Sequence, residues 1–257
     1  MFWRQDYCHI RNGVLTTSLS FIRCCDKTNA TLKRPDMIKK LATTLLLCSL
    51  GFSVQAVDLE YKGFYQRLEI IKDNELDEIT MGFYLVDAQS RDRCAIDKAF
   101  FYGPNVDEQA IDIADDGRLQ IPYDKKLYDS FAVLRVNQVD PGQNCTLQMQ
   151  IQVKNKQKTE FTFVELADYR EQMQDLVDEF GGFLWFMMPD VTGLNLNLND
   201  ARSISFVHQQ LKSDLNCQQL QCTLKIEEDV DETIHAKETA LILSQPPVVI
   251  SPWIAKD

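Results

Sequence analysis

Carboxylates and histidines are the side chains of this chain that could bind a metal ion. Oxygen ligands from carboxylates are what Ca²⁺ prefers. Two acidic runs hold six of them, which are Asp112, Asp115, Asp116, Glu228, Asp229 and Asp231. Neither run matches the calcium loop Asp-x-Asp/Asn-x-Asp/Asn-Gly, and runs of like charge are usually solvated. We therefore predict solvated loops and no metal site, and these six residues are the ones that would come closest to forming one.

The residues needed for nucleophilic catalysis are scarce. After residue 56 only His208 and His235 remain, and no Gly-x-Ser-x-Gly nucleophile elbow is present. A pair of carboxylates can hydrolyse a glycosidic bond, but such a pair is defined by its spacing in the fold rather than in the sequence. The sequence therefore predicts no catalytic residue and no cofactor. It leaves open a hydrolase that uses two carboxylates on a polysaccharide or peptide.

Two stretches that begin Cys-Thr-Leu, at Cys145 and Cys222, place a thiol at the start of an alternating pattern. Successive side chains of a strand point to opposite faces. In "CTLQMQIQV" the face of Cys145 is apolar and includes Met149, whereas Thr146 and the glutamines up to Gln152 share the other face. We expect that polar face to be wet, as in an antiparallel sheet. Each cysteine is either a reactive thiol or half of a disulfide, and the compartment decides which.

Residues 37–56 have the anatomy of a secretory signal peptide. Lys39 and Lys40 precede an apolar run at 41–52, and Val54-Gln55-Ala56 suits cleavage after Ala56. The run is shorter than the ~20 residues of a membrane span. We interpret residues 1–36, which are basic and lack periodicity, as a leader from a misplaced start, so that Met37 is the first residue. If the leader is translated, the alternative is an uncleaved signal acting as a weak anchor.

The charge of the mature chain limits its partners. The whole chain has 27 basic and 38 acidic residues, and residues 1–56 contain 8 and 3 of them, which leaves 19 and 35, a formal net charge of −16. So acidic a surface repels nucleic acid and anionic lipid. The same negative charge would favour cationic partners. We predict a soluble periplasmic protein without a stable membrane span.

Cysteine spacing indicates two disulfides. Cleavage leaves Cys94, Cys145, Cys217 and Cys222, an even number that allows three connectivities. Only four residues separate Cys217 from Cys222, which favours a bridge across a hairpin and leaves Cys94 to pair with Cys145. That second bridge closes a long loop and would stabilise by ~3–4 kcal/mol. The sequence alone leaves the other connectivities open.

The elements expected around these residues are mostly strands. Residues 57–158 contain short apolar runs between turn signals, typical of a β-sandwich or barrel. We predict hairpins from 64–71 with 80–86 and from 131–136 with 145–153, and further strands at 94–102 and 118–121. Eight aromatic residues crowd the first part of this region. We expect a helix and neighbouring strands to cover them.

One helix is expected between two β regions. Apolar residues recur every three or four positions from Leu166 to Phe180, Thr162 and Glu165 fit a capping box, and Gly181-Gly182 ends the pattern. We expect a linking helix at 159–182 that docks on its own core. Residues 183–257 then form a second β region. It opens with an apolar run at 183–188, and its predicted strands are 194–199, 203–207, 222–227, 239–243 and an extended 245–253.

Four stretches of the mature chain resemble a family of secreted gamma-proteobacterial proteins that is known only as a domain of unknown function. They are "LEYKGFYQRL", "MGFYLVDAQ", "LQIPYDKKLYDSFA" and "CTLQMQIQV". The resemblance implies a periplasmic location and no activity. The sequence as a whole predicts a mainly β, sandwich-like protein with one central amphipathic helix, or an α+β protein. Its predicted function is non-enzymatic binding of an unknown envelope protein or ligand, with the hydrolase and a structural accessory of an envelope complex as alternatives.

Overall fold

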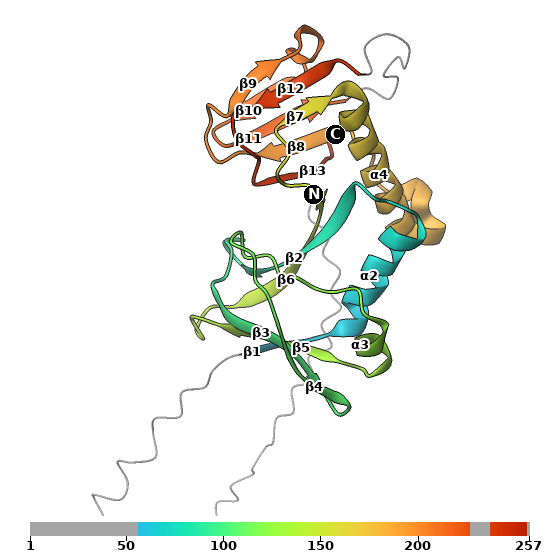
Figure 1. Cartoon of the computed structure of the whole chain (residues 1–257), viewed down its shortest axis with the longest axis vertical. Helices are drawn as coiled ribbons and strands as arrows, with labels where there is room; N and C mark the ends of the chain where they lie inside the picture. Colours follow the sequence, from blue (N-terminus) through green and yellow to red (C-terminus); the bar gives the residue numbers. More distant parts are fainter. Residues whose placement is uncertain (1–55, 227–236, 256–257) are drawn as a thin grey trace, which may run out of the picture. The chain divides into compact units, whose positions relative to one another are not determined.

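Alternating strands and a few helices make up the computed structural model, which describes residues 56–226 and 237–255 (Figure 1). The strands are β1 (Ala56–Glu60), β2 (Ile79–Asp87), β3 (Ile96–Gly103), β4 (Val106–Ile111), β5 (Val133–Gln138), β6 (Cys145–Val153), β7 (Glu160–Thr162), β8 (Gly193–Asn197), β9 (Ile204–Val207), β10 (Leu215–Gln218), β11 (Gln221–Lys225), β12 (Thr239–Leu243) and β13 (Val249–Trp253). The helices are α2 (Tyr61–Asp73), α3 (Lys125–Asp129) and α4 (Phe163–Gly181), with 3₁₀ helices η1 (Gly182–Met187) and η2 (Gln209–Leu211). The predicted mainly β class with a long helix is confirmed.

The strands pair only in antiparallel fashion within the described ranges. One sheet has the order β1-β5-β3-β4, and β2 pairs with β6 in a separate nine-residue ribbon. The later strands form a sheet of order β10-β11-β8-β13 and a smaller one of order β7-β12-β9. The strands expected at 94–102, 194–199, 203–207, 222–227 and 239–243 are found as β3, β8, β9, β11 and β12, with shifted ends.

The hairpin predicted from residues 64–71 and 80–86 is wrong, because the first of these runs lies in helix α2. Its buried residues Tyr61, Phe64 and Tyr65 recur at spacings of three and one, which fits one helix face and not the alternation of a strand. A short apolar run before a turn signal suggested a strand at 64–71, but the spacing of the buried side chains fits the helix. Strand β2 consequently pairs with β6 and not with its neighbour in sequence.

The predicted hairpin of 131–136 with 145–153 is also wrong. The turn between these runs has the expected local chemistry, since the N–H of Gly142 donates to Oδ1 of Asp140 at 2.8 Å. The turn nevertheless joins strands of different sheets, because β5 pairs with β1 and β3 whereas β6 pairs with β2. The strand predicted at 118–121 is wrong, since only Arg118 and Leu119 form isolated bridges there. Turn residues set the local bend, and long-range packing sets the partner strand.

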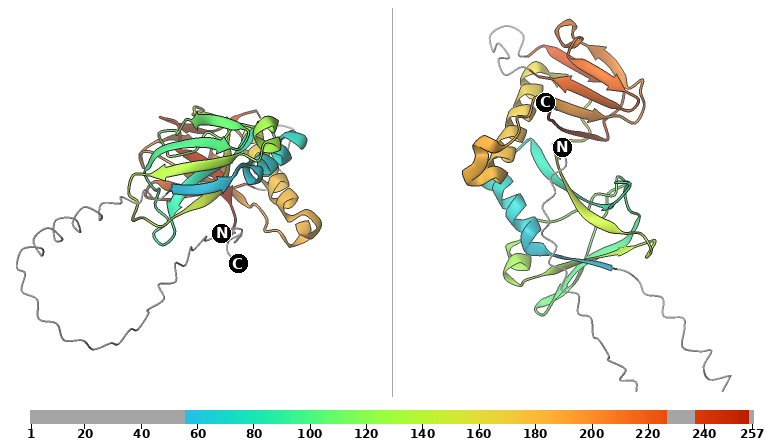
Figure 2. Two further views of the ribbon diagram at one scale, coloured as in Figure 1. Left: turned by 90° about the horizontal axis from the view of Figure 1, so that it is seen from below. Right: turned by 180° about the vertical axis from the view of Figure 1, so that it is seen from behind.

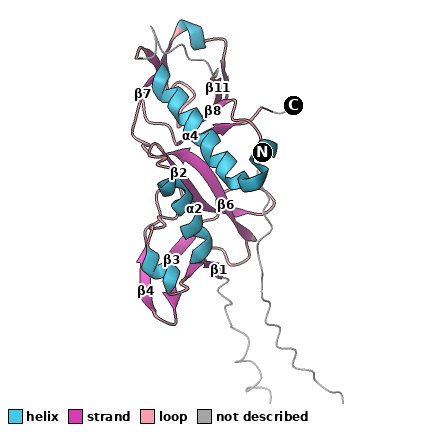
Figure 3. Ribbon diagram, turned by 90° about the vertical axis from the view of Figure 1, so that its right-hand side faces the viewer, coloured by secondary structure: helices cyan, strands magenta, loops and turns pink. Residues whose placement is uncertain are grey.

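Helix α4 lies against strands from several sheets. It contacts β2, β6, β7 and β8 as well as helix α2, as Figure 3 shows from the side of the helix. Its apolar stripe belongs to a hydrophobic core that also contains residues of α2, β2, β8, β11 and β12. Among the helices at positions 56–226 and 237–255, none combines the length and hydrophobicity that a membrane crossing requires.

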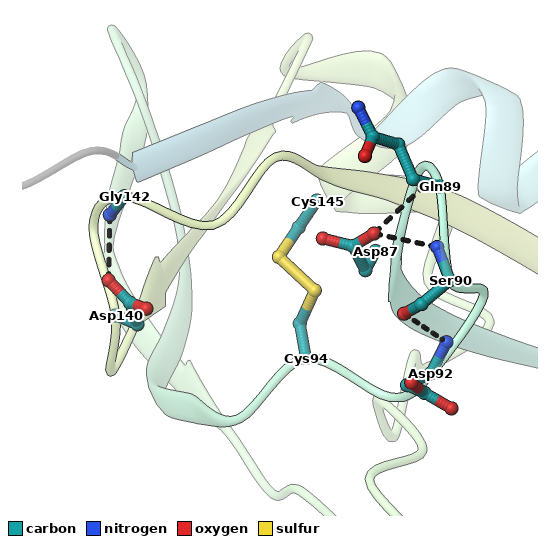
Figure 4. Close-up of a disulfide and its surroundings, with 8 residues drawn as sticks. All are labelled: Asp87, Gln89, Ser90, Asp92, Cys94, Asp140, Gly142 and Cys145. Carbon is teal, nitrogen blue, oxygen red and sulfur yellow. Dashed lines mark hydrogen bonds between the residues drawn. A yellow bond between two sulfur atoms is a disulfide. The ribbon is translucent and has the colours of Figure 1, made fainter.

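Both disulfides have the connectivity that the sequence favoured. Cys94 bonds Cys145 across 51 positions, and Cys217 bonds Cys222 across five. Figure 4 shows the first beside the turn that follows β2, where Oδ1 of Asp87 accepts hydrogen bonds from the backbone N–H groups of Gln89 and Ser90. These two bonds hold the pKa of Asp87 below its usual value.

Candidate functional site

Five consecutive apolar side chains are exposed at the end of helix α4. We call residues 183–187 the apolar segment; their exposed fractions are 90% for Phe183, 49% for Leu184, 59% for Trp185, 63% for Phe186 and 69% for Met187. Single exposed apolar residues are ordinary, but a contiguous exposed patch marks an interaction site. The rear view in Figure 2 shows this stretch (orange) on the side of α4 that faces away from the strands.

Two glycines turn the chain out of α4 and into the apolar segment. Gly182 has φ +53°, a left-handed conformation that L side chains rarely adopt. A Cβ on Gly181 would lie 2.4 Å from Cγ of Met188, so the absence of a side chain there lets Met188 fold back on the helix end. The predicted end of the helix at Gly181-Gly182 is therefore confirmed, and these glycines direct the residues that follow.

The chain returns to α4 immediately after the apolar segment. The N–H of Val191 donates to Oε1 of Gln174 at 2.6 Å, and Nη1 of Arg170 donates to the carbonyl oxygen of Val191 at 3.3 Å. The N–H of Met188 donates to the carbonyl of Trp185 at 2.9 Å. The segment thus lies between the end of α4 and Val191, which is hydrogen-bonded to α4.

Helix α4 is itself fixed by its cap and by its buried face. Thr162 and Glu165 form the predicted capping box, in which each satisfies a backbone N–H of the other. Lys158 pairs with the Glu165 carboxylate. The residues of its buried face are Phe163, Leu166, Tyr169, Met173, Leu176 and Val177. This helix therefore positions the apolar segment relative to the core.

An open pocket of about 300 Å³ lies between α4 and the apolar segment. The residues that line it are Arg170, Gln174, Asp178, Trp185, Phe186, Met188 and Asp190. Asp178 is partly exposed and accepts a hydrogen bond from Nε2 of Gln174 at 2.9 Å, and Asp190 is exposed. A catalytic carboxylic acid needs an environment that keeps it protonated, usually burial. Neither carboxylate of this pocket is buried in that way.

The exposed face of α4 beside the apolar segment is acidic. Burial and repulsion from the carboxylates of Glu171, Asp178 and Glu179 raise the pKa of Asp175. Four like charges within two turns destabilise one another. A cationic group placed over this face would remove that repulsion. The site therefore combines an apolar centre with an acidic border.

Asp116, one of the six candidate metal ligands, belongs to a network of hydrogen bonds that includes one ion pair. Its Oδ2 atom lies 2.5 Å from Nζ of Lys156, and its Oδ1 accepts from the backbone N–H of Arg118 at 3.2 Å. Burial opposes ionisation of Asp116, but Lys156 and Arg118 hold its pKa below the usual value. The guanidinium of Arg93 covers the ring of Tyr84, 3.2 Å from its centroid.

The wet face predicted for β6 is wrong at Gln152, whereas Thr146 on the same face is exposed as expected. Gln152 is fully buried and accepts a hydrogen bond from the Tyr84 hydroxyl at 2.7 Å, whereas Met149 on the supposedly buried face is 36% exposed. Gly82 makes room for both partners, since a Cβ there would lie 2.7 Å from Tyr84 and 2.8 Å from Gln152. Tyr84, the partner of Gln152, is in turn contacted by Arg93 and Asp116, which come from loops outside β6.

The remaining candidate residues do not gather. Asp112 and Asp115 are exposed, and no group of three metal-binding side chains occurs in the part of the chain that the structure describes. Nε2 of His208 lies 3.6 Å from Oε2 of Glu238. The candidates Glu228, Asp229 and Asp231, with His235, lie outside the described residues.

Sequence reasoning noted the apolar run at 183–188 but not its exposure. The signal that could have revealed it is the pair Gly181-Gly182 before the run and Pro189 after it, since breakers on both sides isolate six residues from either neighbouring element. Trp253, the other tryptophan of this region, lies in the sheet strand β13 and is only partly exposed.

Comparison with known proteins gives a match to a family profile. Neither a curated protein nor a solved structure matches this chain. A family profile matches residues 53–198, which is more than half of the chain and includes both the apolar segment and the network around Asp116. The chain therefore belongs to DUF2987, a family described as a protein of unknown function.

Proposed function

We propose that this protein is a non-enzymatic interaction protein of the gamma-proteobacterial periplasm. Its apolar segment would dock into an apolar recess of an envelope protein whose rim is basic. The observation that carries this proposal is the exposure of five consecutive apolar side chains between the end of α4 and Val191. Burying the side chain of Phe183 alone would contribute roughly 1.5–3 kcal/mol to such a contact.

Charge favours a basic protein over the other possible occupants. The acidic face of α4 and the mature net charge of −16 oppose contact with an anionic membrane, and the same face on a second copy would repel the first. A protein with Lys or Arg around an apolar recess relieves the repulsion among Glu171, Asp175, Asp178 and Glu179. Such a rim also fits the polar borders found around protein interfaces.

The periplasmic location is supported by the signal-peptide pattern at residues 37–56 and by the two disulfides, which persist in oxidising compartments. Intact mass spectrometry of protein from a periplasmic extract tests this part of the proposal. We expect a chain that starts at Val57 and lacks four hydrogens. A reduced chain that begins at Met1 would contradict secretion from Met37.

Docking is tested by photo-crosslinking in living cells. A photoreactive amino acid at Phe183 should form discrete adducts with a protein, whereas the same amino acid at Phe131 should not. Phe131 is a matched control because it is 80% exposed yet lies outside the apolar segment. The crosslinked partner peptide should be apolar and flanked by Lys or Arg.

The acidic border gives a second readout. Replacing Asp175, Asp178 and Glu179 by their amides should reduce the Phe183 adduct at low salt and leave it unchanged at high salt, since exposed charges are screened. Identical adducts from positions 183 and 131 would refute docking at this segment. Binding to neutral lipid vesicles would mean that the apolar segment docks on lipid and not on a basic protein. A dimer that Trp185→Ser abolishes would mean that it docks on a second copy of the chain. A structural accessory would differ from a transient binder only in the lifetime of the contact.

A further inference from the structure

The second disulfide lies in a hairpin at the edge of a sheet. Strands β10 and β11 pair so that Cys217 is directly opposite Cys222, with their Cα atoms 4.0 Å apart. The N–H of Lys225 donates to the carbonyl of Asp214 at 2.9 Å, so by the alternation of antiparallel pairs the two cysteines occupy a position without backbone hydrogen bonds between them. Side chains approach most closely at such positions.

The two sulfur atoms of this bridge have different surroundings. Cys217 is exposed, whereas Cys222 is 1% exposed and belongs to the hydrophobic core. In the other bridge Cys94 is 3% exposed and Cys145 is partly buried against the core. A thiolate must approach one sulfur of a disulfide in order to exchange with it. The sulfur of Cys217 is therefore the one that such a reagent reaches first.

Strand β10 has little to hold it besides the bridge. It is the outer strand of its sheet and pairs only with β11, and three of its four residues are exposed. The turn that follows requires φ +55° at Gln219, an unfavourable conformation for a residue with a side chain. One backbone bond ties the turn to the rest of the sheet, from the N–H of Leu198 to the carbonyl of Leu220 at 2.7 Å. Apart from the bridge, β10 is therefore held by one four-residue pairing and by the packing of Leu215 against the core.

We propose that Cys217–Cys222 is a site of thiol–disulfide exchange with a dithiol, and that its reduction releases β10 from β11. A thiolate of the dithiol attacks Sγ of Cys217, the bond between the two sulfurs breaks, and Cys222 leaves as a thiolate. The second thiol of the reagent then attacks the mixed disulfide and frees Cys217. The reagent ends as a disulfide, and its two electrons and two protons reside on Cys217 and Cys222.

Release of β10 has a consequence for the neighbouring surface. Leu215 of β10 is one wall of a pocket of about 400 Å³ whose other lining residues are Ile204, Ser205, Phe206, Val207 and Lys212. Four of these six are the residues of β9, the edge strand of the adjacent sheet. Reduction therefore opens an apolar surface along β9, in a part of the chain beyond residues 53–198 that the family profile matches.

Partial reduction of the oxidised protein with dithiothreitol tests the exchange site. Thiols are trapped with an alkylating reagent at intervals and the modified cysteines are identified by mass spectrometry. We expect Cys217 and Cys222 to be alkylated at least about tenfold faster than Cys94 and Cys145, because access controls the rate. A protein dithiol that lacks its second thiol should be trapped on Cys217. Equal rates for the two bridges, or trapping on Cys222, would overturn the proposal.

Hydrogen exchange tests the release of β10. After selective reduction, the amides of Asn216 and Gln218, which occupy the hydrogen-bonded positions opposite β11, should lose protection while those of β6 keep it. Gln219→Gly is the matched variant, because glycine adopts the positive φ without strain. It should be reduced at the wild-type rate but keep the protection of β10 afterwards. Unchanged protection of reduced wild-type β10 would refute the release, and equal loss in Gln219→Gly would refute the role of the turn.

Discussion

The buried face of α4 and the apolar segment are neighbours in the chain with similar composition and opposite surroundings. Met173 is fully buried and Met187 is 69% exposed, and a single helix end separates them. Burial of the first stripe contributes to folding, since apolar surface removed from water is the main favourable term. The side chains of the apolar segment contribute less of that kind in the isolated chain, because half or more of the surface of most of them stays exposed. Its side chains are available for a partner, and the comparison separates residues that hold the fold from residues that serve binding.

The largest expected effect comes from truncating the buried stripe. Met173→Ala should lower the free energy of unfolding by about 2–5 kcal/mol, because it removes packed atoms and leaves a cavity. Met187→Ala makes the same chemical change at an exposed site and should alter stability by less than about 0.5 kcal/mol. Urea denaturation of the two variants measures both. A comparable loss in Met187→Ala would mean that the apolar segment packs on the fold.

The two disulfides extend the comparison from side chains to cross-links. Replacing Cys94 and Cys145 by alanine releases a loop of 51 positions and should cost about 4 kcal/mol in the chain-entropy estimate, against about 2 kcal/mol for the five-position loop of Cys217 and Cys222. Thermal unfolding without reductant checks which of the two double variants has the lower melting temperature. Equal melting temperatures would show that the loop length does not set the difference.

A smaller effect is expected at the start of α4. Thr162→Ala removes the oxygen that accepts from the N–H of Glu165 and should destabilise by ~1 kcal/mol. Thr239→Ala is a suitable control, since that threonine donates to Glu160 on the surface and caps no helix. Chemical denaturation of both variants measures the cap. If the two losses are equal, the capping box does not fix the helix that carries the apolar segment.

Local chemistry made some of these elements predictable. Both ends of α4 could be placed because Thr162 and Glu165 at its start and Gly182 at its end act through contacts within a few residues. The Cys217–Cys222 bridge follows from a hairpin of the same short range. The pairing of β2 with β6 could not be predicted from the sequence. It joins residues some 70 positions apart, and the choice of partner strand depends on packing. Helix α2 was missed because aromatic residues suit strands as well as buried helix faces.

The candidate site was predictable only in its composition. The sequence reveals that residues 183–188 are apolar, but exposure depends on what other segments cover, and here α4 holds the run outward through Gln174 and Arg170. The opposite error occurred at Gln152, a polar residue that was expected in water but is buried and bonded to the Tyr84 hydroxyl. Burial is a property of the assembled fold, and alternation predicts only which residues share a face.

The smallest effect concerns a charge pair on the open surface. Nε and Nη2 of Arg135 donate to the two carboxylate oxygens of Asp58 at 2.8 and 2.7 Å, and these bonds hold the pKa of Asp58 below its usual value. A depressed pKa means that stability is gained above the unfolded-state value of ~3.9 and is lost as the pH falls through the folded-state pKa. Both side chains are about 40% exposed, with fractions of 38% and 41%, so the gain should be only ~0.2–1 kcal/mol.

Asp58→Asn should therefore be slightly less stable than the wild type at pH 7. The difference should vanish as the pH falls below the folded-state pKa, which denaturation curves at several pH values can measure. A loss as large as that of Met173→Ala would overturn the view that burial, rather than surface charge, determines which residues hold this fold.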